Sequence, residues 1–250
     1  MPAGGKPLTG RMAGGGGAGE KHTRTAAIIP AAGQGRRIGS SKPKQFLVLL
    51  GKPLLYYSLD VFEKSGWIDE IYLVVPEGME SYCREEILEK FGFKKIKGIL
   101  KGGQTRQDSV YQGLTALPPD IERVVVHDGV RPFLTGELLG RAVRDCTREI
   151  DGVVVAVPLK DTPKRVRAGG WIDSTVNREG LYLAQTPQVF WAGVFKEAYK
   201  NAGKEGLKGT DDSALVEEIG GKIRILEGSG ENIKVTTPED LAHAERILEN

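Results

Sequence analysis

The sequence predicts an α/β protein with a doubly wound, mostly parallel sheet and a protruding β-hairpin arm. Short runs of β-branched residues, such as Arg123–His127 (RVVVH) and Gly152–Val157 (GVVVAV), alternate with longer amphipathic segments. Continuous valine and isoleucine runs of this kind are typical of parallel strands that are buried on both faces. The alternation stops after residue 157, where a polar segment contains the pair Gly169-Gly170 and predicts the hairpin.

The predicted elements follow in chain order. The strands are Ala26–Pro30, Glu70–Val75, Ile96–Leu100, Arg123–His127 and Gly152–Val157. The helices between them are Pro53–Lys64, Met79–Phe91, Arg106–Leu117 and Thr135–Arg148. The first of these helices places Leu54, Leu55, Ser58, Val61 and Phe62 near one face, at three- and four-residue spacing. In an open sheet of this kind, ligands bind outside the carboxyl ends of the strands.

The second half of the chain contains the hairpin and five further elements. Two short β-prone runs, Arg165–Arg167 and Trp171–Val176, flank the glycine pair, whose turn positions need a positive φ. A segment with so little apolar content cannot form its own core, so residues 159–184 are expected to extend from the domain as an arm. Helices are predicted at Trp191–Ala202 and Asp211–Ile219, and strands at Lys222–Leu226 and Asn232–Val235. The last helix is predicted to begin with Thr237 as N-cap and Pro238 at its first position.

The composition is that of an ordinary globular protein. Of the 250 residues, 40% are hydrophobic and 27% are charged, which argues against a disordered chain or a coiled coil. No stretch approaches the roughly 18 apolar residues of a membrane helix, so no membrane partner is expected. The net charge of +2 gives no global sign of nucleic-acid binding. Cys83 and Cys146 match no metal spacing and favour a reduced, cytoplasmic location.

The first 24 residues differ from the rest of the chain. They contain eight of the 34 glycines and almost no large apolar side chain. Such a segment cannot bury enough surface to offset the entropy lost on ordering, so residues 1–24 are expected to be a disordered tail. No secretory signal is expected, because the segment has no apolar centre. Residues 25–250 are predicted to form a single domain.

The strongest functional signal directly follows the first predicted strand. Pro30–Ile38 reads PAAGQGRRI, and Lys42–Gln45 reads KPKQ. A dinucleotide fingerprint needs a glycine where Ile38 stands, and a Walker loop needs a Gly-Lys-Ser/Thr sequence. The segment instead suits a phosphate chain, which backbone N–H groups can approach and nearby cations can neutralise. Those cations are Arg36, Arg37, Lys42 and Lys44. The alternative is an ordinary turn with solvated surface cations.

With four further motifs, this segment resembles the 2-C-methyl-D-erythritol 4-phosphate cytidylyltransferase family of the sugar nucleotidyltransferase superfamily. The four are Gly102–Val110 (GGQTRQDSV), His127–Pro132 (HDGVRP), Thr186–Gln188 (TPQ) and Asn232–Thr236 (NIKVT). The resemblance extends from about Thr25 to the C-terminus and implies a Rossmann-like nucleotidyltransferase fold. It also implies transfer of CMP from CTP to the phosphate of methylerythritol phosphate, with Mg2+ (or Mn2+) as cofactor. This reaction belongs to the non-mevalonate isoprenoid pathway.

The resemblance assigns a role to each matching position. Arg37 and Lys44 match the cations that stabilise the transition state, and Asp128 matches a metal ligand. The nucleotide-binding positions are Ala31, Ala32, Gly33, Gly35, Gly103, Gln104 and Ser109. The acceptor-binding positions are Thr162, Arg178, Lys234 and Arg131, of which Arg178 and Lys234 position the acceptor phosphate. No catalytic His–Cys or Ser–His pair is required, because the nucleophile is already an anion at neutral pH.

The family also implies a homodimer with arm exchange, in which Thr162 and Arg178 reach the active site of the partner subunit. Two positions depart from the family pattern. Gly129-Val130 stands where the family usually has two alanines, and Gln104 replaces an acidic residue of some relatives. His127 is expected to be a structural hydrogen-bonding group, and Asp211 is expected to cap a helix.

Three other functions compete with this one. A cytidylyltransferase for another polyol phosphate, such as ribitol 5-phosphate, would share the fold, the loop and much of the arm. A regulatory module that binds CTP without turnover would not need both donor and acceptor cations. A hydride-transferring dehydrogenase is disfavoured by Ile38 and by the cationic loop.

Overall fold

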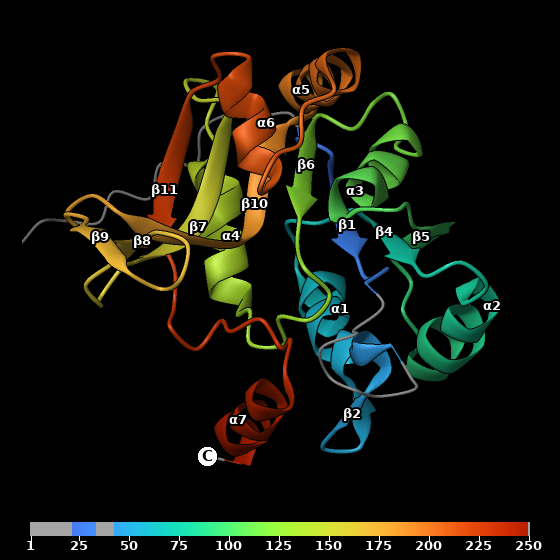
Figure 1. Cartoon of the computed structure of the whole chain (residues 1–250). Helices are drawn as coiled ribbons and strands as arrows, with labels where there is room; N and C mark the ends of the chain where they lie inside the picture. The colour runs from blue at the N-terminus through green and yellow to red at the C-terminus, as the bar shows by residue number, and fades with distance from the viewer. Residues whose placement is uncertain (1–21, 34–42, 250) are drawn as a thin grey trace, which may run out of the picture.

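The computed structural model describes residues 22–33 and 43–249, which are built around a seven-stranded sheet (Figure 1). The strand order is β11-β7-β10-β6-β1-β4-β5. The strands are β1 (Thr25–Pro30), β4 (Glu70–Val75), β5 (Ile96–Lys101), β6 (Arg123–Val126), β7 (Gly152–Pro158), β10 (Tyr182–Trp191) and β11 (Ile223–Glu227). β10 runs antiparallel to both of its neighbours, and the other adjacent pairs are parallel. The predicted doubly wound, mostly parallel sheet is therefore confirmed.

Helices cover both faces of the sheet. One face carries α1 (Leu54–Lys64), α4 (Gly136–Asp145) and α2 (Glu80–Cys83), which continues as a π-helical segment, η3 (Arg84–Glu89). The other face carries α3 (Arg106–Thr115), α5 (Ala192–Glu205) and α6 (Asp212–Glu218). The strands supply both cores because successive side chains point to opposite faces. In β1, Ala27 and Ile29 face α1, whereas Ala26 and Ile28 face α3 and α5.

A smaller unit lies below the carboxyl ends of the parallel strands (Figure 1). It consists of the turn η2 (Lys44–Phe46), the short hairpin of β2 (Val48–Leu49) and β3 (Lys52–Pro53), and the last helix α7 (Pro238–Glu249). Leu49, Val235 and Ala244 form its small core. α7 begins as predicted, because the Asp240 carboxylate accepts from the Thr237 N–H while the Thr237 hydroxyl accepts from the Asp240 N–H.

The structure contains a central strand that the sequence did not predict, β10. Its inner half contains polar residues and a proline, which are unusual in a central strand: Gln185, Thr186, Pro187 and Gln188. The register with β7 shifts between Ala184 and Gln188, so the ladder is irregular where the proline stands. The polar side chains find partners instead of solvent; for example, Gln188 donates to Asp211 at 2.7 Å.

The predicted strand Asn232–Val235 is wrong. The segment is irregular and pairs with no strand of the sheet. Its backbone is held at two points, because the Val235 N–H donates to the Val130 carbonyl at 2.9 Å and the Asn232 carbonyl accepts from Arg131 at 2.7 Å. A β-branched run therefore lies here as a connection over the ends of the strands.

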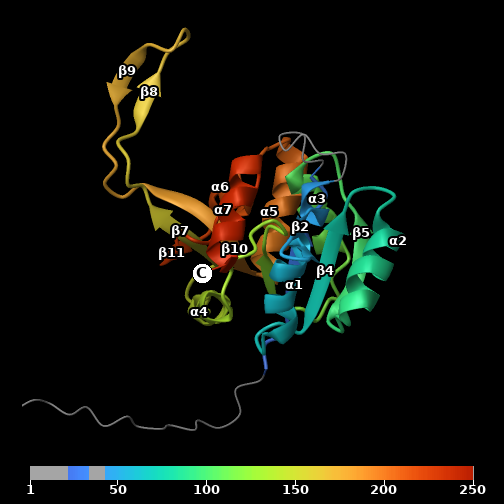
Figure 2. The same cartoon turned by 90° about the horizontal axis from the view of Figure 1, so that it is seen from below.

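The predicted hairpin is confirmed and projects from the body of the molecule (Figure 2). It consists of β8 (Lys164–Val166) and β9 (Ile172–Thr175), which pair only with each other. Gly169 and Gly170 both have a φ of 83°, as the predicted turn requires. Every residue from Lys164 to Thr175 is exposed, so the hairpin has no core of its own.

Most of the predicted tail, residues 1–21, lies outside the described residues, as do residues 34–42 and residue 250. The last part of that tail lies against the domain: His22 contacts Asp69 at 2.8 Å, and Arg24 pairs with Glu70 and Asp120. Across the described residues, no helix is long and apolar enough to cross a bilayer.

Candidate active site

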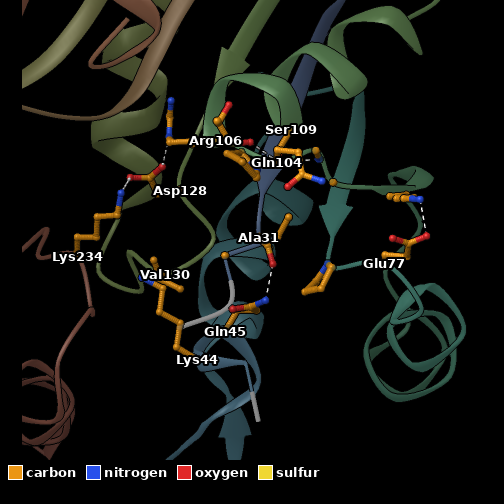
Figure 3. A pocket seen from close by; sticks show the side chains of 18 residues that line it. Ala31, Lys44, Gln45, Glu77, Gln104, Arg106, Ser109, Asp128, Val130 and Lys234 are labelled. Carbon is orange, nitrogen blue, oxygen red and sulfur yellow. Dashed lines mark hydrogen bonds and ion pairs between the residues drawn. The ribbon is translucent and has the colours of Figure 1, made fainter. Parts of the chain in front are cut away.

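A cavity of about 610 Å3 opens at the carboxyl ends of β1, β4, β5 and β6 (Figure 3). This is the edge of the sheet where the fold class predicts ligands. Many of the predicted site residues line it: Ala31, Ala32, Gly33, Lys44, Gly103, Gln104, Ser109, Asp128 and Lys234. Residues from five separate segments of the chain thus meet in one cavity.

The turn that carries Lys44 is fixed to the end of β1. The buried side chain of Gln45 donates to the Ala31 carbonyl. The next residue, Phe46, packs edge-on against Tyr82 of α2, with ring centroids 5.1 Å apart. Lys44 therefore faces the cavity from a backbone that is anchored on both the loop after β1 and α2.

The loop between β5 and α3 forms a narrow slot. The Ser109 hydroxyl accepts from the Gly103 N–H at 3.1 Å and donates to the Thr105 carbonyl at 2.9 Å. Thr105 and Asp108 form a capping box that fixes the start of α3. Ser109 thus shapes the loop, in addition to any contact with a base.

Crowding requires glycine at two positions of this slot. A Cβ on Gly102 would lie 2.2 Å from the Cβ of Ala32, and a Cβ on Gly103 would lie 2.2 Å from the Cβ of Asp108. Real Cβ atoms do not approach so closely, so any side chain at either position would push the loop away from β1 or α3. The spacing between the loop and Ala32 therefore depends on the two glycines.

Asp128 lies directly after β6 and faces three cations. Its Oδ1 accepts from Arg106 Nε at 2.9 Å, and its Oδ2 contacts Lys234 Nζ at 2.9 Å (Figure 3). Arg131 Nε lies 3.5 Å from Oδ2, which is too long for a good hydrogen bond. Burial alone would raise the pKa of Asp128, but the charges of Arg106, Lys234 and Arg131 outweigh it and hold the pKa well below its usual range.

Arg106 is shared between two carboxylates. Its Nη1 lies 2.8 Å from Oδ2 of Asp212, a buried residue at the start of α6. The Tyr199 hydroxyl of α5 donates to the other oxygen of Asp212 at 2.6 Å. Burial by itself would lower the pKa of Arg106, but Asp212 and Asp128 outweigh it and raise the pKa. This guanidinium joins the start of α3, the end of β6 and the layer of α5 and α6.

His127 is a structural residue in this geometry, as expected. It is fully buried, and burial lowers its pKa to about 4, so the imidazole is neutral. Its Nε2 donates to the Arg131 carbonyl at 3.3 Å, and its Nδ1 accepts from the Thr186 hydroxyl at 3.0 Å. The same hydroxyl accepts from the Asp128 N–H at 3.0 Å. The chain of hydrogen bonds fixes the backbone on which Asp128 stands.

Three of the remaining predicted residues, Arg131, Thr162 and Arg178, do not line the cavity. Arg131 is buried behind Asp128 and does not line it. Thr162 and Arg178 are exposed residues of the arm, and the Arg178 guanidinium donates to the Lys160 carbonyl of the same arm. Arg37 and Gly35 lie outside the described residues. The described chain thus brings six of the seven residues predicted to bind the nucleotide into one cavity without the arm.

Three residues of this site, Arg106, Thr186 and Gln45, were not predicted from the sequence. Arg106 and Thr186 belong to the motifs Gly102–Val110 and Thr186–Gln188, but nothing in the spacing of these motifs shows that the two residues contact Asp128 or its backbone. Gln45 follows Lys44 directly in the cationic segment. For Arg106, its place in the chain could have indicated the role. It is the first residue of a helix that follows a glycine-containing loop, where a long side chain can reach back over the ends of the strands.

A divalent cation fits this cavity with one protein ligand. No group of three or more His, Cys, Asp or Glu side chains capable of holding a metal occurs among residues 22–33 and 43–249. Asp128 lines the cavity, and Mg2+ commonly keeps one or two carboxylates beside substrate phosphates. Both oxygens of Asp128 contact cations in this state, so a metal would share the carboxylate with Arg106 or Lys234 or replace one of them.

Comparisons with known proteins agree with this geometry. The family model for IspD, 2-C-methyl-D-erythritol 4-phosphate cytidylyltransferase, matches residues 25–250. A protein of that name from Geotalea uraniireducens is 47% identical over 91% of this chain and 97% of its own length. A bifunctional IspD/IspF enzyme from Desulforudis audaxviator is 46% identical over 90% of this chain and 56% of its own length.

Solved structures show the same fold. The crystal structure of 4-diphosphocytidyl-2C-methyl-D-erythritol synthase from Anaerococcus prevotii matches with a TM-score of 0.81 and 33% identity, over 92% of this chain and 97% of that one. The 2-C-methyl-D-erythritol 4-phosphate cytidylyltransferase of Thermus thermophilus matches with a TM-score of 0.75 and 32% identity, over 91% of this chain and all of that one. Sequence and fold together place the chain in the 2-C-methyl-D-erythritol 4-phosphate cytidylyltransferase family, whose members are nucleotidyltransferases of the non-mevalonate pathway.

Proposed function

We propose that this protein transfers CMP from CTP to 2-C-methyl-D-erythritol 4-phosphate, giving 4-diphosphocytidyl-2-C-methyl-D-erythritol and pyrophosphate. The observation that carries the proposal is the meeting of Lys44, Asp128 and Lys234 in one cavity with the Gly102–Ser109 slot. Such a cavity offers cations for a phosphate chain beside a tight recess for a flat ring. Membership of the family supports the choice of substrates.

The reaction needs no general base. An oxygen of the acceptor phosphate, already an anion at neutral pH, attacks the α-phosphorus of CTP in line. The new P–O bond forms as the bond between the α-phosphorus and its bridging oxygen breaks, and pyrophosphate leaves with the electron pair. Catalysis then consists of holding the two phosphates in line and neutralising the charge that develops. The neutral, enclosed His127 is consistent with this, because it has no access to either substrate.

Lys44 and Arg37 are proposed to stabilise the charge on the triphosphate in the transition state. The Gln45–Ala31 and Phe46–Tyr82 contacts fix the backbone that carries Lys44 beside the cavity before the nucleotide binds. Preorganised charge of this kind acts mainly on the transition state. Replacing Lys44 by alanine is therefore expected to lower kcat much more than it raises KM.

Asp128 is proposed to hold Mg2+, or Mn2+, together with the phosphates of the nucleotide. The metal would supply Lewis-acid charge at the α-phosphorus. Arg106 and the His127–Thr186 hydrogen bonds orient the carboxylate from two sides. Lys234 is proposed to position the acceptor phosphate, with Arg131 held behind Asp128.

The Gly102–Ser109 slot is proposed to receive the cytosine. Ala32, Gly103, Gln104 and Ser109 line it, and Gly102 and Ala32 lie so close together that no side chain fits on Gly102. A single ring fits such a recess better than a purine. Backbone groups of the loop after β1, including Gly33, would then face the phosphates of the nucleotide.

The arm is proposed to exchange between two subunits and to bring Thr162 and Arg178 to the partner's cavity. The apolar side chains along it support the proposal, because they are exposed in the single chain: Val166, Trp171, Ile172, Leu181, Tyr182 and Leu183. Trp171 is 76% exposed, which is unusual for a tryptophan that no partner covers. We also propose a cytoplasmic location, consistent with the free, buried Cys83 and Cys146.

The direct test is pyrophosphate release from CTP and Mg2+ with two acceptors in parallel, 2-C-methyl-D-erythritol 4-phosphate and ribitol 5-phosphate. Turnover with the first alone is the expected result. Turnover with the second alone would contradict the proposed acceptor while retaining the chemistry. Tight CTP binding without pyrophosphate release from either would support a binding module instead.

A second experiment tests arm exchange. Lys44→Ala and Arg178→Ala are each expected to be inactive alone, since the first lacks a donor-side cation and the second an acceptor-side cation. After dissociation and random reassociation, half of the dimers are mixed, and each mixed dimer contains one intact site, so about a quarter of wild-type activity should return. No recovery from demonstrated mixed dimers would contradict a shared site.

A further inference from the structure

The three cations around Asp128 are not held equally. Arg106 is fixed by a second carboxylate, because Asp212 binds its Nη1 at 2.8 Å and Tyr199 in turn holds Asp212. Arg131 is buried, and its Nη1 donates to the Asn232 carbonyl at 2.7 Å. Both guanidinium groups therefore keep a partner if Asp128 turns to another ligand.

Lys234 differs from both in its partners and its surroundings. Among the described residues its ammonium contacts Asp128 alone, at 2.9 Å, and its side chain is 37% exposed. It lines the cavity, at the same wall as Asp128 (Figure 3). An ammonium on a flexible four-carbon chain can turn from a carboxylate toward the cavity that lies beside it.

The backbone that carries Lys234 does not have to move for such an exchange. Asn232 is buried, and its amide donates to the Thr186 carbonyl at 2.9 Å. Val235 is bound to the Val130 carbonyl at 2.9 Å. Lys234 lies between these two anchors, so its backbone is fixed. Rotation about its side-chain bonds alone can move the ammonium between Asp128 and the cavity.

From this asymmetry we infer that Lys234 is the resident counter-ion of Asp128 and exchanges partners when nucleotide and metal bind. A divalent cation and the Lys234 ammonium compete for Oδ2 of Asp128. Once displaced, Lys234 is available to the acceptor phosphate, so the acceptor side of the cavity becomes complete only after the nucleotide side is filled. This inference rests on the proposed function, because it takes Asp128 as the metal ligand and Lys234 as the acceptor-binding residue.

The charges of the wall allow this exchange. Lys234 is a third cation beside Asp128, and when it leaves, Arg106 and Arg131 still face the two carboxylates of Asp128 and Asp212. After exchange, the metal and Lys234 both face phosphates, whose charge exceeds that of one carboxylate. The competition predicts an unusual result: removing a cation that serves turnover should improve metal binding.

The first experiment measures Mn2+ binding to the full chain by the electron paramagnetic resonance signal of free Mn2+. The nucleotide is the α,β-methylene analogue of CTP, which cannot release pyrophosphate, and no acceptor is present. Lys234→Met is expected to bind Mn2+ roughly tenfold more tightly than wild type, the change expected when one partly buried ion pair no longer competes. Lys44→Met is the matched control, since it removes the same charge from the same cavity but not from Asp128.

Several outcomes would overturn the exchange. Unchanged or weaker Mn2+ binding in Lys234→Met shows that Lys234 does not compete for Asp128. An equal gain in Lys44→Met shows a general effect of cavity charge. An absence of Mn2+ binding in every variant shows that the carboxylate is not a metal ligand. The titration involves no turnover, so failure of the proposed reaction with every acceptor is seen separately, in the pyrophosphate assay.

A second measurement follows Lys234 from the acceptor side. Calorimetry with 2-C-methyl-D-erythritol 4-phosphate and the methylene analogue is run with and without Mg2+. Wild type is expected to bind the acceptor about tenfold more tightly with Mg2+, because the metal releases Lys234, and linkage requires the two effects to be reciprocal. Lys234→Met is expected to lose most of this gain. An equal gain in both proteins would overturn the inference.

Discussion

The cavity wall and the arm carry the same kinds of residues in opposite surroundings. In the wall, Asp128 is buried and fixed by Arg106, whose other side is fixed by Asp212. In the arm, Asp173 pairs with Arg167 on an exposed hairpin that packs against nothing else in the described chain. The wall is therefore complete within one chain, whereas the arm has its local structure but lacks the contacts that would fix its place.

This difference separates two kinds of functional residue. Residues of the wall, such as Asp128 and Arg106, are expected to combine function with stability, because each also pairs with a buried neighbour. Residues of the arm can be replaced with little effect on the folded domain and are expected to affect assembly and acceptor binding. Matched substitutions in the two regions test this division, and they are taken from the largest expected effect to the smallest.

The largest difference in the free energy of unfolding is expected between the Asp128→Ala and Asp173→Ala variants. The first leaves three cations facing an empty position and should lower the free energy of unfolding by about 3 to 5 kcal/mol, as well as abolish turnover. The second breaks an exposed pair and should cost about 1 kcal/mol or less. Urea denaturation of both variants measures this. Equal losses would show that the wall is not the more constrained region.

Two glycines form the next pair, Gly102→Ala and Gly170→Ala. At Gly102 the new methyl group meets Ala32 and displaces the slot, so KM for CTP should rise by about a hundredfold, the loss of about 3 kcal/mol of binding. At Gly170 the space is open and the strain is only that of a positive φ in an exposed turn, so KM for CTP should not change. Steady-state kinetics with varied CTP distinguishes the two. A normal KM in Gly102→Ala would show that the loop tolerates a shift.

Conservative arginine replacements should have a smaller effect. Arg106→Lys keeps the charge but cannot bridge Asp128 and Asp212 with one planar group, so kcat should fall about tenfold and the free energy of unfolding by about 1 to 2 kcal/mol. Arg167→Lys in the arm should change neither quantity measurably. If Arg106→Lys retains full kcat, the bridge is not needed to orient Asp128.

The smallest effect on the folded domain is expected from Trp171→Ala. The side chain is 76% exposed and touches no core, so the free energy of unfolding of the separate subunit should change by no more than about 0.5 kcal/mol. Sedimentation equilibrium should show weaker dimerisation by at least tenfold, if the arm forms the interface, since buried tryptophans often dominate interfaces. Unchanged association would place the interface elsewhere on the chain.

The order and type of most elements could be predicted from the sequence, because their signals are local. β-branched runs marked the parallel strands, and Thr237 with Pro238 marked a helix start. The positive φ of Gly169 and Gly170 was predicted from their turn position alone. Each of these features depends on residues within a few positions of one another.

The two elements that were predicted wrongly, β10 and Asn232–Val235, depend instead on contacts between distant parts of the chain. β10 was missed because Gln185, Thr186 and Gln188 are polar residues that become buried only through partners far along the chain, such as Asn232 and Asp211. The segment Asn232–Val235 was predicted as a strand because its pattern is locally extended, yet it pairs with no strand of the sheet. In both cases the outcome depends on which segments pair, and this cannot be read from the local sequence.

By itself, the sequence determined the succession of strands and helices, the turn of the arm and the motifs from which a cytidylyltransferase could be recognised. The tertiary structure decided which charges meet: Arg106 with both Asp128 and Asp212, and Lys234 with Asp128 alone. The physical reason is distance along the chain. Helix and turn preferences act between neighbours, whereas an ion pair joins residues a hundred positions apart and exists only after the whole sheet has brought its strand ends together.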